Sequence, residues 1–444
     1  MQAVDTLILG GTLLCLDEAM TQIEDGALAI QGDSILAIGT AADLRARFTS
    51  PNVIDGRDCL IMPGLINGHT HAAMTCFRGI ADDLPLMDWL NDYIFPAEAR
   101  NVDPELVYWG SLLACAEMIK SGTTSFCDMY IFEEETARAA KEAGMRCLLG
   151  EVLYDFPSPS YPTPAAGLAL TRQLLERYAD DPLIRIAVEP HALYTCSEPL
   201  LVQARDLARE FNAPLALHLL ENQAEKSQLL AKYGQGAVTY LEQLVCLDER
   251  LIAFHCVAFD DEDIRRFAEH GCKVVYNPES NMKLASGFAP VARMRAAGIP
   301  VGLGTDGCAS NNDLDLFQEM DTAAKLEKVR HLDPTLLPAP AVVAMATREG
   351  ARVLGLEGVT GSLRPGLKAD LILIDLKRPH LTPMYHPYSH LVYAVTGADV
   401  KTVFINGRLV MRDRQLLTLD EGEIMERVNR IAGRISRSLV KSVP

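Results

Sequence analysis

The sequence predicts an α/β fold, in which a (β/α)₈ barrel is joined to a small β domain that both ends of the chain build. Three observations support this prediction. The chain has 444 residues, enough to bury a barrel core and leave an appendage. Eight strand-like apolar runs alternate with helical segments over a stretch of the size that a (β/α)₈ barrel needs. The two flanking regions instead carry short strands separated by turn residues.

The flanking regions share one sequence pattern, in which a short apolar run is followed closely by glycine or another turn residue. Short runs of this kind are typical of a small β unit. They occupy residues 7–9, 27–30 and 35–38 near the N-terminus, and residues 369–375 and 401–410 near the C-terminus.

Because chain termini often lie close together, we expect the two flanking regions to pair. Residues 1–58 and 359–415 would then form one discontinuous β-sandwich domain, and residues 59–358 the barrel. Residues 416–444 are expected to form a C-terminal helix, with helical periodicity over residues 421–439.

The middle of the chain alternates between the two kinds of element. The strand-like runs are residues 59–65, 123–128, 146–152, 184–189, 214–219, 251–256, 272–276 and 300–304. Amphipathic helical segments between them include residues 106–119, 133–143, 168–178, 200–211 and 262–270. A doubly wound open sheet is the alternative, but the Gly-x-Gly-x-x-Gly turn that a dinucleotide would need is absent.

Composition limits the classes of partner. The formal net charge of -18 argues against a nucleic-acid backbone, which needs a basic face. No apolar stretch reaches the about 18 residues expected of a membrane span. The 11 cysteines include no Cys-x-x-Cys pair, which favours free thiols in a reducing compartment. With no basic and apolar secretion signal at the N-terminus, we expect a cytoplasmic location.

His69 and His71 are the strongest chemical signal in the chain. On an extended backbone two histidines one residue apart point the same way and can bind one divalent ion together. A His-x-His pair alone is more often an ordinary pair of polar side chains. Other polar residues, however, also follow predicted barrel strands at the ends where catalytic side chains project. They are His191, His218, His255 and Asp306.

Together these residues predict a metal site formed by His69, His71, His218 and Asp306, with one position open for water. A two-metal site often uses a lysine carbamate at the end of the fourth strand, but that strand ends Val188-Glu-Pro-His191. We therefore expect one divalent ion in each chain. Mostly imidazole ligands favour Zn²⁺, with Fe²⁺ as the alternative.

A bound Zn²⁺ lowers the pKa of its water toward neutrality, but protons must still be accepted and donated. Asp306 can accept the water proton. Glu221, three residues beyond His218, would lie one turn away if a helix starts there, and could carry a proton to the substrate. An exposed acid at a helix start is the alternative for Glu221. His255 could orient or stabilise the hydroxide.

These motifs resemble the amidohydrolase superfamily in its mononuclear deaminase branch, and the resemblance spans nearly the whole chain. It is carried by Pro63-Gly-Leu65 with His69 and His71, His218-Leu-Leu-Glu221, His255-Cys256, Gly304-Thr-Asp-Gly307 and Gly366-Leu-Lys-Ala-Asp-Leu371. It implies a TIM-like metal-dependent hydrolase barrel and a hydrolase that acts on a cyclic amidine C–N bond.

Within the superfamily the chain is most similar to the 5'-methylthioadenosine/S-adenosylhomocysteine deaminases. The matching segments are Thr75-Cys-Phe-Arg-Gly79, Asp82-Asp-Leu84, Trp89-Leu90, Pro96-Ala-Glu98, Pro190-His-Ala-Leu-Tyr-Thr195 and residues 277–287. The resemblance implies that Glu98 accepts hydrogen bonds from ribose hydroxyls. It also implies that His191 and Trp89 contact the substrate, together with Glu221 and Asp306. Without this resemblance, Glu98 would be interpreted as a surface acid and Trp89 as a core aromatic.

We therefore predict hydrolytic deamination of a 6-aminopurine nucleoside. The loop over residues 153–164 offers Tyr154 and Phe156 but no arginine to clamp a carboxylate. That favours 5'-methylthioadenosine over S-adenosylhomocysteine and adenosine. The alternatives are an aminohydrolase acting on guanine, a pterin or an s-triazine, and a non-catalytic metal-stabilised scaffold. A homo-oligomer, dimer or tetramer, is expected.

Overall fold

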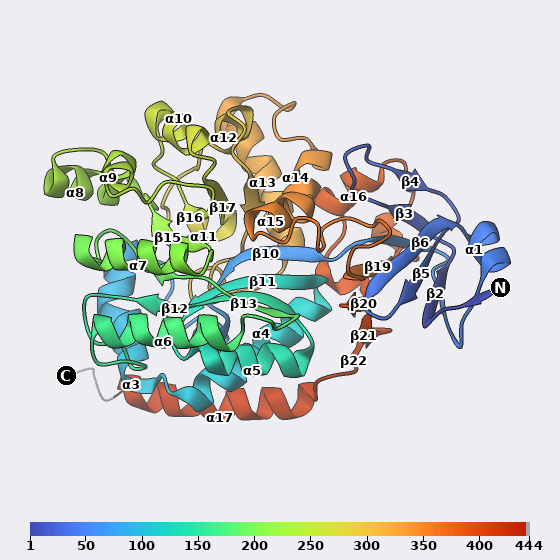
Figure 1. The fold of residues 1–444 in the computed structure, drawn as a ribbon, viewed down its shortest axis with the longest axis horizontal. Coiled ribbons are helices and arrows are strands. Elements are labelled where there is room, and N and C mark those ends of the chain that lie inside the picture. Colours follow the sequence, from blue (N-terminus) through green and yellow to red (C-terminus); the bar gives the residue numbers. More distant parts are fainter. Residues whose placement is uncertain (441–444) are drawn as a thin grey trace.

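The computed structural model describes residues 1–440, and the chain forms a parallel β-barrel with a β-sandwich at one end (Figure 1). The barrel strands pair in parallel in chain order within two sheets. The first sheet contains β10 (Leu65–Thr70), β11 (Thr123–Tyr130), β12 (Arg146–Leu153), β13 (Ile184–Ile186) and β14 (Glu189–Pro190). The second contains β15 (Leu215–Leu219), β16 (Leu251–His255), β17 (Lys273–Tyr276) and β18 (Val301–Leu303).

Backbone contacts at both seams close the two sheets into one barrel. Val188 forms a parallel bridge with Leu215 at one seam. At the other seam the Asp306 amide donates to the His69 carbonyl over 2.9 Å. The strands are almost wholly buried, as expected when helices cover a parallel sheet. The (β/α)₈ prediction is confirmed.

Helices cover the barrel and connect its strands (Figure 1). They are α2 (Leu86–Asp88), α3 (Phe95–Asn101), α4 (Pro104–Lys120), α5 (Glu133–Ala143), α6 (Pro164–Arg177), α7 (Glu198–Glu210), α8 (Gln223–Tyr233), α9 (Ala237–Gln243), α10 (Asp261–Glu269), α11 (Pro278–Lys283), α12 (Val291–Ala296), α13 (Leu316–His331), α14 (Ala339–Met345) and α15 (Arg348–Val353). A 3₁₀ turn (Ala72–Phe77) and a π-helical turn (Trp89–Ile94) follow the first strand.

The sandwich draws its strands from both ends of the chain. One sheet contains β2 (Thr6–Leu9), β5 (Gly26–Gln31), β6 (Ser34–Thr40) and β8 (Asn52–Asp55). The other contains β3 (Thr12–Leu14), β4 (Gln22–Ile23), β9 (Cys59–Pro63), β19 (Leu371–Asp375), β20 (Val400–Ile405), β21 (Arg408–Arg412) and β22 (Gln415–Leu416). Buried side chains of both sheets, such as Leu28 and Phe404, form one shared apolar core.

Short elements complete the sandwich and the C-terminal region. They are β1 (Gln2–Ala3), β7 (Phe48–Thr49), α1 (Ala41–Arg47), α16 (Pro387–Tyr393), α17 (Glu421–Val440) and the 3₁₀ turns Pro379–Leu381 and Gly397–Asp399. Helix α17 runs along the outside of the barrel, where Arg434 pairs with Asp103 over 2.8 Å (Figure 1). The predicted helix over residues 421–439 corresponds to α17.

The predicted first barrel strand, residues 59–65, is wrong. It divides into two elements, because β9 pairs with β19 in the sandwich whereas β10 pairs with β11 in the barrel. The chain crosses between the sheets at Gly64, where a Cβ atom would lie 2.2 Å from the Thr124 side chain. We propose the domain division expected from the sequence, with its first boundary moved to Gly64.

The Gly64 crossing yields a stability prediction. Gly64→Ala should lower the free energy of unfolding by about 1–3 kcal/mol, because the added methyl overpacks a buried contact. Urea denaturation measures the loss. Gly433→Ala in α17 is the matched control, since its Cβ would meet nothing nearer than an Arg437 nitrogen at 3.7 Å. Equal stability of the two variants would contradict this account of Gly64.

Candidate active site

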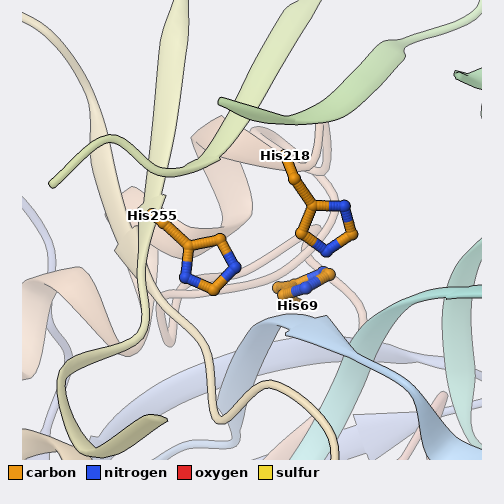
Figure 2. Close-up of side chains that lie close together, drawn as sticks. All are labelled: His69, His218 and His255. Atoms are coloured by element: carbon orange, nitrogen blue, oxygen red, sulfur yellow. The ribbon is translucent and has the colours of Figure 1, made fainter. Parts of the chain in front are cut away.

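Four imidazoles and one carboxylate converge at the carboxyl ends of the barrel strands. They belong to His69, His71, His218, His255 and Asp306. Figure 2 shows the rings of His69, His218 and His255 gathered around one point, each from a different strand. Two groups have ligand atoms within 4.8 Å of one another, His69–His218–His255 and His69–His71–Asp306. Residues that lie far apart in the sequence therefore share one small volume.

His69 shows that this volume suits a metal ion. Its side chain is fully buried, and neither ring nitrogen has a hydrogen-bond partner in the part of the chain described. Buried polar atoms are normally paired, so this imidazole needs a partner that the protein does not supply. His69 Nε2 lies 3.5 Å and His71 Nε2 lies 3.2 Å from Asp306 Oδ1. Ligand atoms of one tetrahedral Zn²⁺ are expected about 3.3–3.6 Å apart, so the donors fit.

Backbone carbonyls select the tautomer of two imidazoles. His71 Nδ1 donates to the Met129 carbonyl, and His218 Nδ1 donates to the His191 carbonyl over 3.0 Å. Each ring therefore carries its proton on Nδ1 and keeps a free lone pair on Nε2. Such a carbonyl partner commonly orients a metal-binding histidine and makes its free nitrogen a better ligand.

His255 is held in the opposite tautomer. The amide nitrogens of Asn281 and Asn277 face its Nδ1 at 2.8 and 3.3 Å, so this nitrogen accepts. The proton then lies on Nε2, which faces Asp306 Oδ2 at 3.9 Å. A protonated nitrogen cannot bind a metal. This arrangement favours His69, His71, His218 and Asp306 as ligands and leaves His255 as a hydrogen-bond donor beside them.

The two carboxyl groups of the site have opposite proton affinities. Burial opposes ionisation of Asp306, but the imidazole rings of His69, His71 and His255 beside it hold its pKa well below the usual range. Burial raises the pKa of Glu221 well above its usual value, and the nearby carboxylates of Asp306 and Glu225 add to this effect. A pair of acids with separated pKa values can supply one proton acceptor and one proton donor.

Glu221 reaches the site by a route that differs from the sequence prediction. Helix α8 begins only at Gln223, after the N-cap Asn222, so Glu221 lies in the link between strand and helix. Leu220 adopts a left-handed backbone, with φ of 52°. Glu225 accepts the amides of Leu220 and Glu221 at 3.1 and 2.7 Å and so fixes this link. Glu221 is buried and lines a cavity, so it is not an exposed acid.

The other predicted residues line the same cavity. Glu98 on α3 accepts a hydrogen bond from Tyr130 Oη at 2.6 Å, and burial raises its pKa to about 7. His191 lies beside His218, with ring centroids 4.8 Å apart, and burial lowers its pKa to about 3. Trp89 forms part of the wall and donates Nε1 to the Ala81 carbonyl over 3.2 Å. All nine residues predicted for the site are thus brought together.

Left-handed backbone occurs repeatedly at the strand ends. His255 has φ of 71° and Asp306 φ of 63°, which is costly for residues with a side chain. Asp306 Oδ2 accepts from Ser280 Oγ at 2.6 Å, which helps to hold this conformation. Strained residues of this kind cluster at functional sites, where surrounding contacts maintain them.

Sequence reasoning missed the residues that orient the site. Asn281 and Ser280 act on His255 and Asp306, whereas Met129 and Tyr130 act on His71 and Glu98. Met129 acts through its carbonyl, which every residue has, so its identity carries no signal. Asp128, a polar residue that ends a predicted barrel strand, did carry the signal used for the other residues.

Comparison with known proteins identifies the family of this chain. The profile described as "Amidohydrolase family" matches residues 60–410. The chain belongs to the amidohydrolase family. A short second match, over residues 26–49, is to a bacterial imidazolonepropionase-like composite domain. The family predicted from the sequence is therefore confirmed.

Two relatives and one solved structure are similar to this chain over most or all of its length. A protein of Syntrophus aciditrophicus named 5-methylthioadenosine/S-adenosylhomocysteine deaminase 1 is 74% identical over 100% of both chains. A 5'-deoxyadenosine deaminase of Methanothermobacter thermautotrophicus is 48% identical over 84% of this chain and 87% of its own. A zinc-bound adenosine deaminase structure from Xanthomonas campestris superposes with a TM-score of 0.97 at 38% identity, covering 98% of this chain and 99% of that one.

Proposed function

We propose that this amidohydrolase removes the 6-amino group of an adenosine-type nucleoside by hydrolysis, with 5'-methylthioadenosine as its preferred substrate. The observation that carries the proposal is the convergence of a metal-binding cluster, an acid with a raised pKa and Glu98 on one cavity. The products would be 5'-methylthioinosine and ammonia. The deaminase names of relatives at 74% and 48% identity support the same reaction.

One divalent ion would be held by His69, His71, His218 and Asp306, and Zn²⁺ suits the three imidazoles, with Fe²⁺ as the alternative. The zinc in the 38% identical adenosine deaminase structure supports this assignment. When bound, the ion supplies Lewis-acid chemistry that lowers the pKa of a water molecule toward neutrality.

The side chains of the site then manage the protons. Glu221 donates a proton to purine N1, a role that suits a carboxyl group whose pKa is raised. Asp306 takes one proton from the attacking water and passes it to the departing ammonia, and the second water proton returns to Glu221 as the C6 carbonyl forms. His255 donates from Nε2 toward the incoming oxygen, because its Nδ1 is occupied by Asn281.

Ribose recognition is assigned to Glu98, since a carboxylate can accept from two neighbouring hydroxyls. His191, neutral because burial lowers its pKa, and Trp89 would complete the contacts to the nucleoside. Guanine, pterins and s-triazines lack a ribose, so they would leave Glu98 without a function. A non-catalytic scaffold would likewise leave Glu221 and His255 without a role.

The cavity wall favours an apolar 5' substituent. Among the described residues that line it are Tyr154, Leu86 and Leu284, and none is lysine or arginine. A homocysteine carboxylate would therefore lack a cationic partner.

The helices, the cysteines and the net charge bear on where the protein acts and with what. Within residues 1–440 no helix combines the length and apolarity required to span a bilayer. All 11 cysteines are buried free thiols, which supports a cytoplasmic location. We also propose a homo-oligomer, dimer or tetramer, and no nucleic-acid partner, in line with the acidic charge.

Replacing Glu221 tests the proton donor. Glu221→Gln should reduce kcat by about 10²–10⁴-fold, because the amide cannot give up a proton, while the metal content stays at one ion per chain. Steady-state rates from the loss of adenine absorbance, with metal analysis, measure both quantities. Glu327→Gln, a buried carboxyl group on α13 that is absent from the described cavity wall, is the control and should reduce kcat far less. Near-normal turnover of Glu221→Gln would refute the assignment.

The pH dependence tests Glu98. Its pKa of about 7 means that the free enzyme loses the carboxylate as pH falls through neutrality. A protonated Glu98 accepts hydrogen bonds from ribose less well, so kcat/KM should fall as the pH is lowered from roughly 8.5 to 5.5. At the lower end of this range the fall should approach tenfold per pH unit. Glu98→Gln should flatten this limb and reduce kcat/KM at high pH by about 10- to 100-fold. An unchanged kcat/KM in Glu98→Ala would argue against a nucleoside substrate.

Substrate comparison tests the 5' assignment. The value of kcat/KM should be highest for 5'-methylthioadenosine and at least about tenfold lower for S-adenosylhomocysteine, the cost of about 1.4 kcal/mol for an unpaired carboxylate. 5'-Deoxyadenosine, which is also apolar at this end, should remain a good substrate, whereas adenosine should be poorer. An ultraviolet scan with each nucleoside measures the rates. Comparable values for all four would contradict the preference.

A further inference from the structure

The end of strand β10 is held by an acid that the proposed reaction does not use. Asp128 Oδ1 accepts from the Ala72 amide and from Thr70 Oγ1, both at 2.6 Å, and the same Thr70 hydroxyl also faces the Cys127 carbonyl at 2.8 Å. Thr70 and Ala72 are the immediate neighbours of His71. The next residue on β11, Met129, accepts from the His71 ring itself. His71 is therefore held before, after and at its ring by two consecutive residues of one strand.

The backbone ladder alone does not hold this segment. The register between β10 and β11 shifts between Asn67 and Thr70, so the pairing is irregular beside His69. Regular β10 ends at Thr70, and His71 has φ of -126° and ψ of 75°, outside ideal strand geometry. The Asp128 carboxylate thus takes the place of ladder hydrogen bonds at the point where the chain turns to present His71.

The Asp128 carboxylate is buried, which is energetically unfavourable. Asp128 is fully buried and its hydrogen-bond donors, Thr70 and Ala72, are uncharged. Its other oxygen, Oδ2, has no donor in the described chain, and the carboxyl group of Glu133, which is 1% exposed, lies close enough to interact unfavourably with a charge on Asp128. Burying a carboxylate without a charged partner is unfavourable, and a cation bound by His71 nearby would offset part of that cost.

We propose that Asp128 is a positioning residue for the metal centre, whose Oδ1 holds Thr70 and Ala72 and thereby fixes the direction of the His71 ring. The inference rests on the metal centre proposed above. It assigns Asp128 no contact with substrate. Groups that orient a metal-binding histidine commonly change metal affinity by 10- to 100-fold when they are removed.

The geometry distinguishes substitutions at this position. Asp128→Asn keeps Oδ1 as the acceptor for both donors, and its new amide can donate to the Glu133 carboxyl. Asp128→Ala removes the acceptor and leaves the Ala72 amide buried without a partner. Thr70→Val deletes one of the two donors at nearly constant volume, and it supplies a second route to the same effect if Asp128→Ala does not fold.

The experiment measures Zn²⁺ affinity of the full chain by competition with a chromophoric chelator. Asp128→Ala should bind Zn²⁺ about 10- to 100-fold more weakly than the wild type, and Thr70→Val should bind more weakly in the same direction. Asp128→Asn should stay within about threefold of the wild type, because both hydrogen bonds to Oδ1 persist. The absorption spectrum of the Co²⁺-loaded protein should change in Asp128→Ala and not in Asp128→Asn.

Asp370→Ala is the matched control. Asp370 is a buried carboxylate that pairs with Arg146 over 2.9 Å, at the start of β12 and so at the opposite end of the barrel. Its loss should lower the melting temperature and leave Zn²⁺ affinity unchanged. A general loss of stability therefore does not imitate the expected result.

Three outcomes would count against the proposals, each in a different way. Unchanged Zn²⁺ affinity in Asp128→Ala, or in Thr70→Val if the first variant does not fold, would overturn the positioning role. An Asp128→Asn variant as weak as Asp128→Ala would overturn it too, because hydrogen bonding to Oδ1 would then not be what matters. A wild-type chain that binds no Zn²⁺ would instead overturn the metal centre on which the inference rests.

Discussion

The structure depends most on the burial of His69, an imidazole with no hydrogen-bond partner in the described protein. An unpaired polar ring in a barrel core is unfavourable unless a ligand completes it. His69 is also the one residue common to both groups of potential ligand atoms. Its strand, β10, lies at the seam where the barrel closes, since the Asp306 amide donates to the His69 carbonyl. The backbone hydrogen bond that closes the barrel therefore also joins two residues of the site.

Hydrogen bonds from neighbouring segments give chemically similar side chains different protonation states. Carbonyls at His71 and His218 leave Nε2 free to bind a cation, whereas two asparagine amides at His255 leave its Nε2 protonated. Neighbouring imidazoles lower the pKa of Asp306 and burial raises the pKa of Glu221, so the surroundings also separate the proton affinities of these two carboxyl groups. The end of β11 contacts both the metal-binding cluster and the residue proposed to bind ribose, because Met129 orients His71 and Tyr130 orients Glu98. The roles therefore come from the surroundings of each residue more than from its type.

The path of the chain explains how the sandwich is tied to the barrel. Strand β9 completes a sheet with β19, and one residue later β10 enters the barrel. An unbroken apolar run conceals this crossing, because a buried strand has the same composition in either sheet. Pro63 and Gly64 mark it, yet the same pair is equally compatible with a bend within one strand. Which sheet receives each half is decided by pairing partners more than 50 residues away along the chain.

The sequence by itself determined the order of most strands and helices and the family, and it predicted nine site residues that the structure brings together. The strand ends of a parallel barrel meet at one edge, which is why the polar residues that follow them could be grouped in advance. The sequence could not determine which nitrogen of each histidine is protonated or how Glu221 enters the cavity. Those features depend on the Met129 and His191 carbonyls, the Asn281 amide and the left-handed turn at Leu220. Each is a contact between segments or a local dihedral angle. Only the tertiary structure decides them, because residue type and spacing do not encode the distance between two strands.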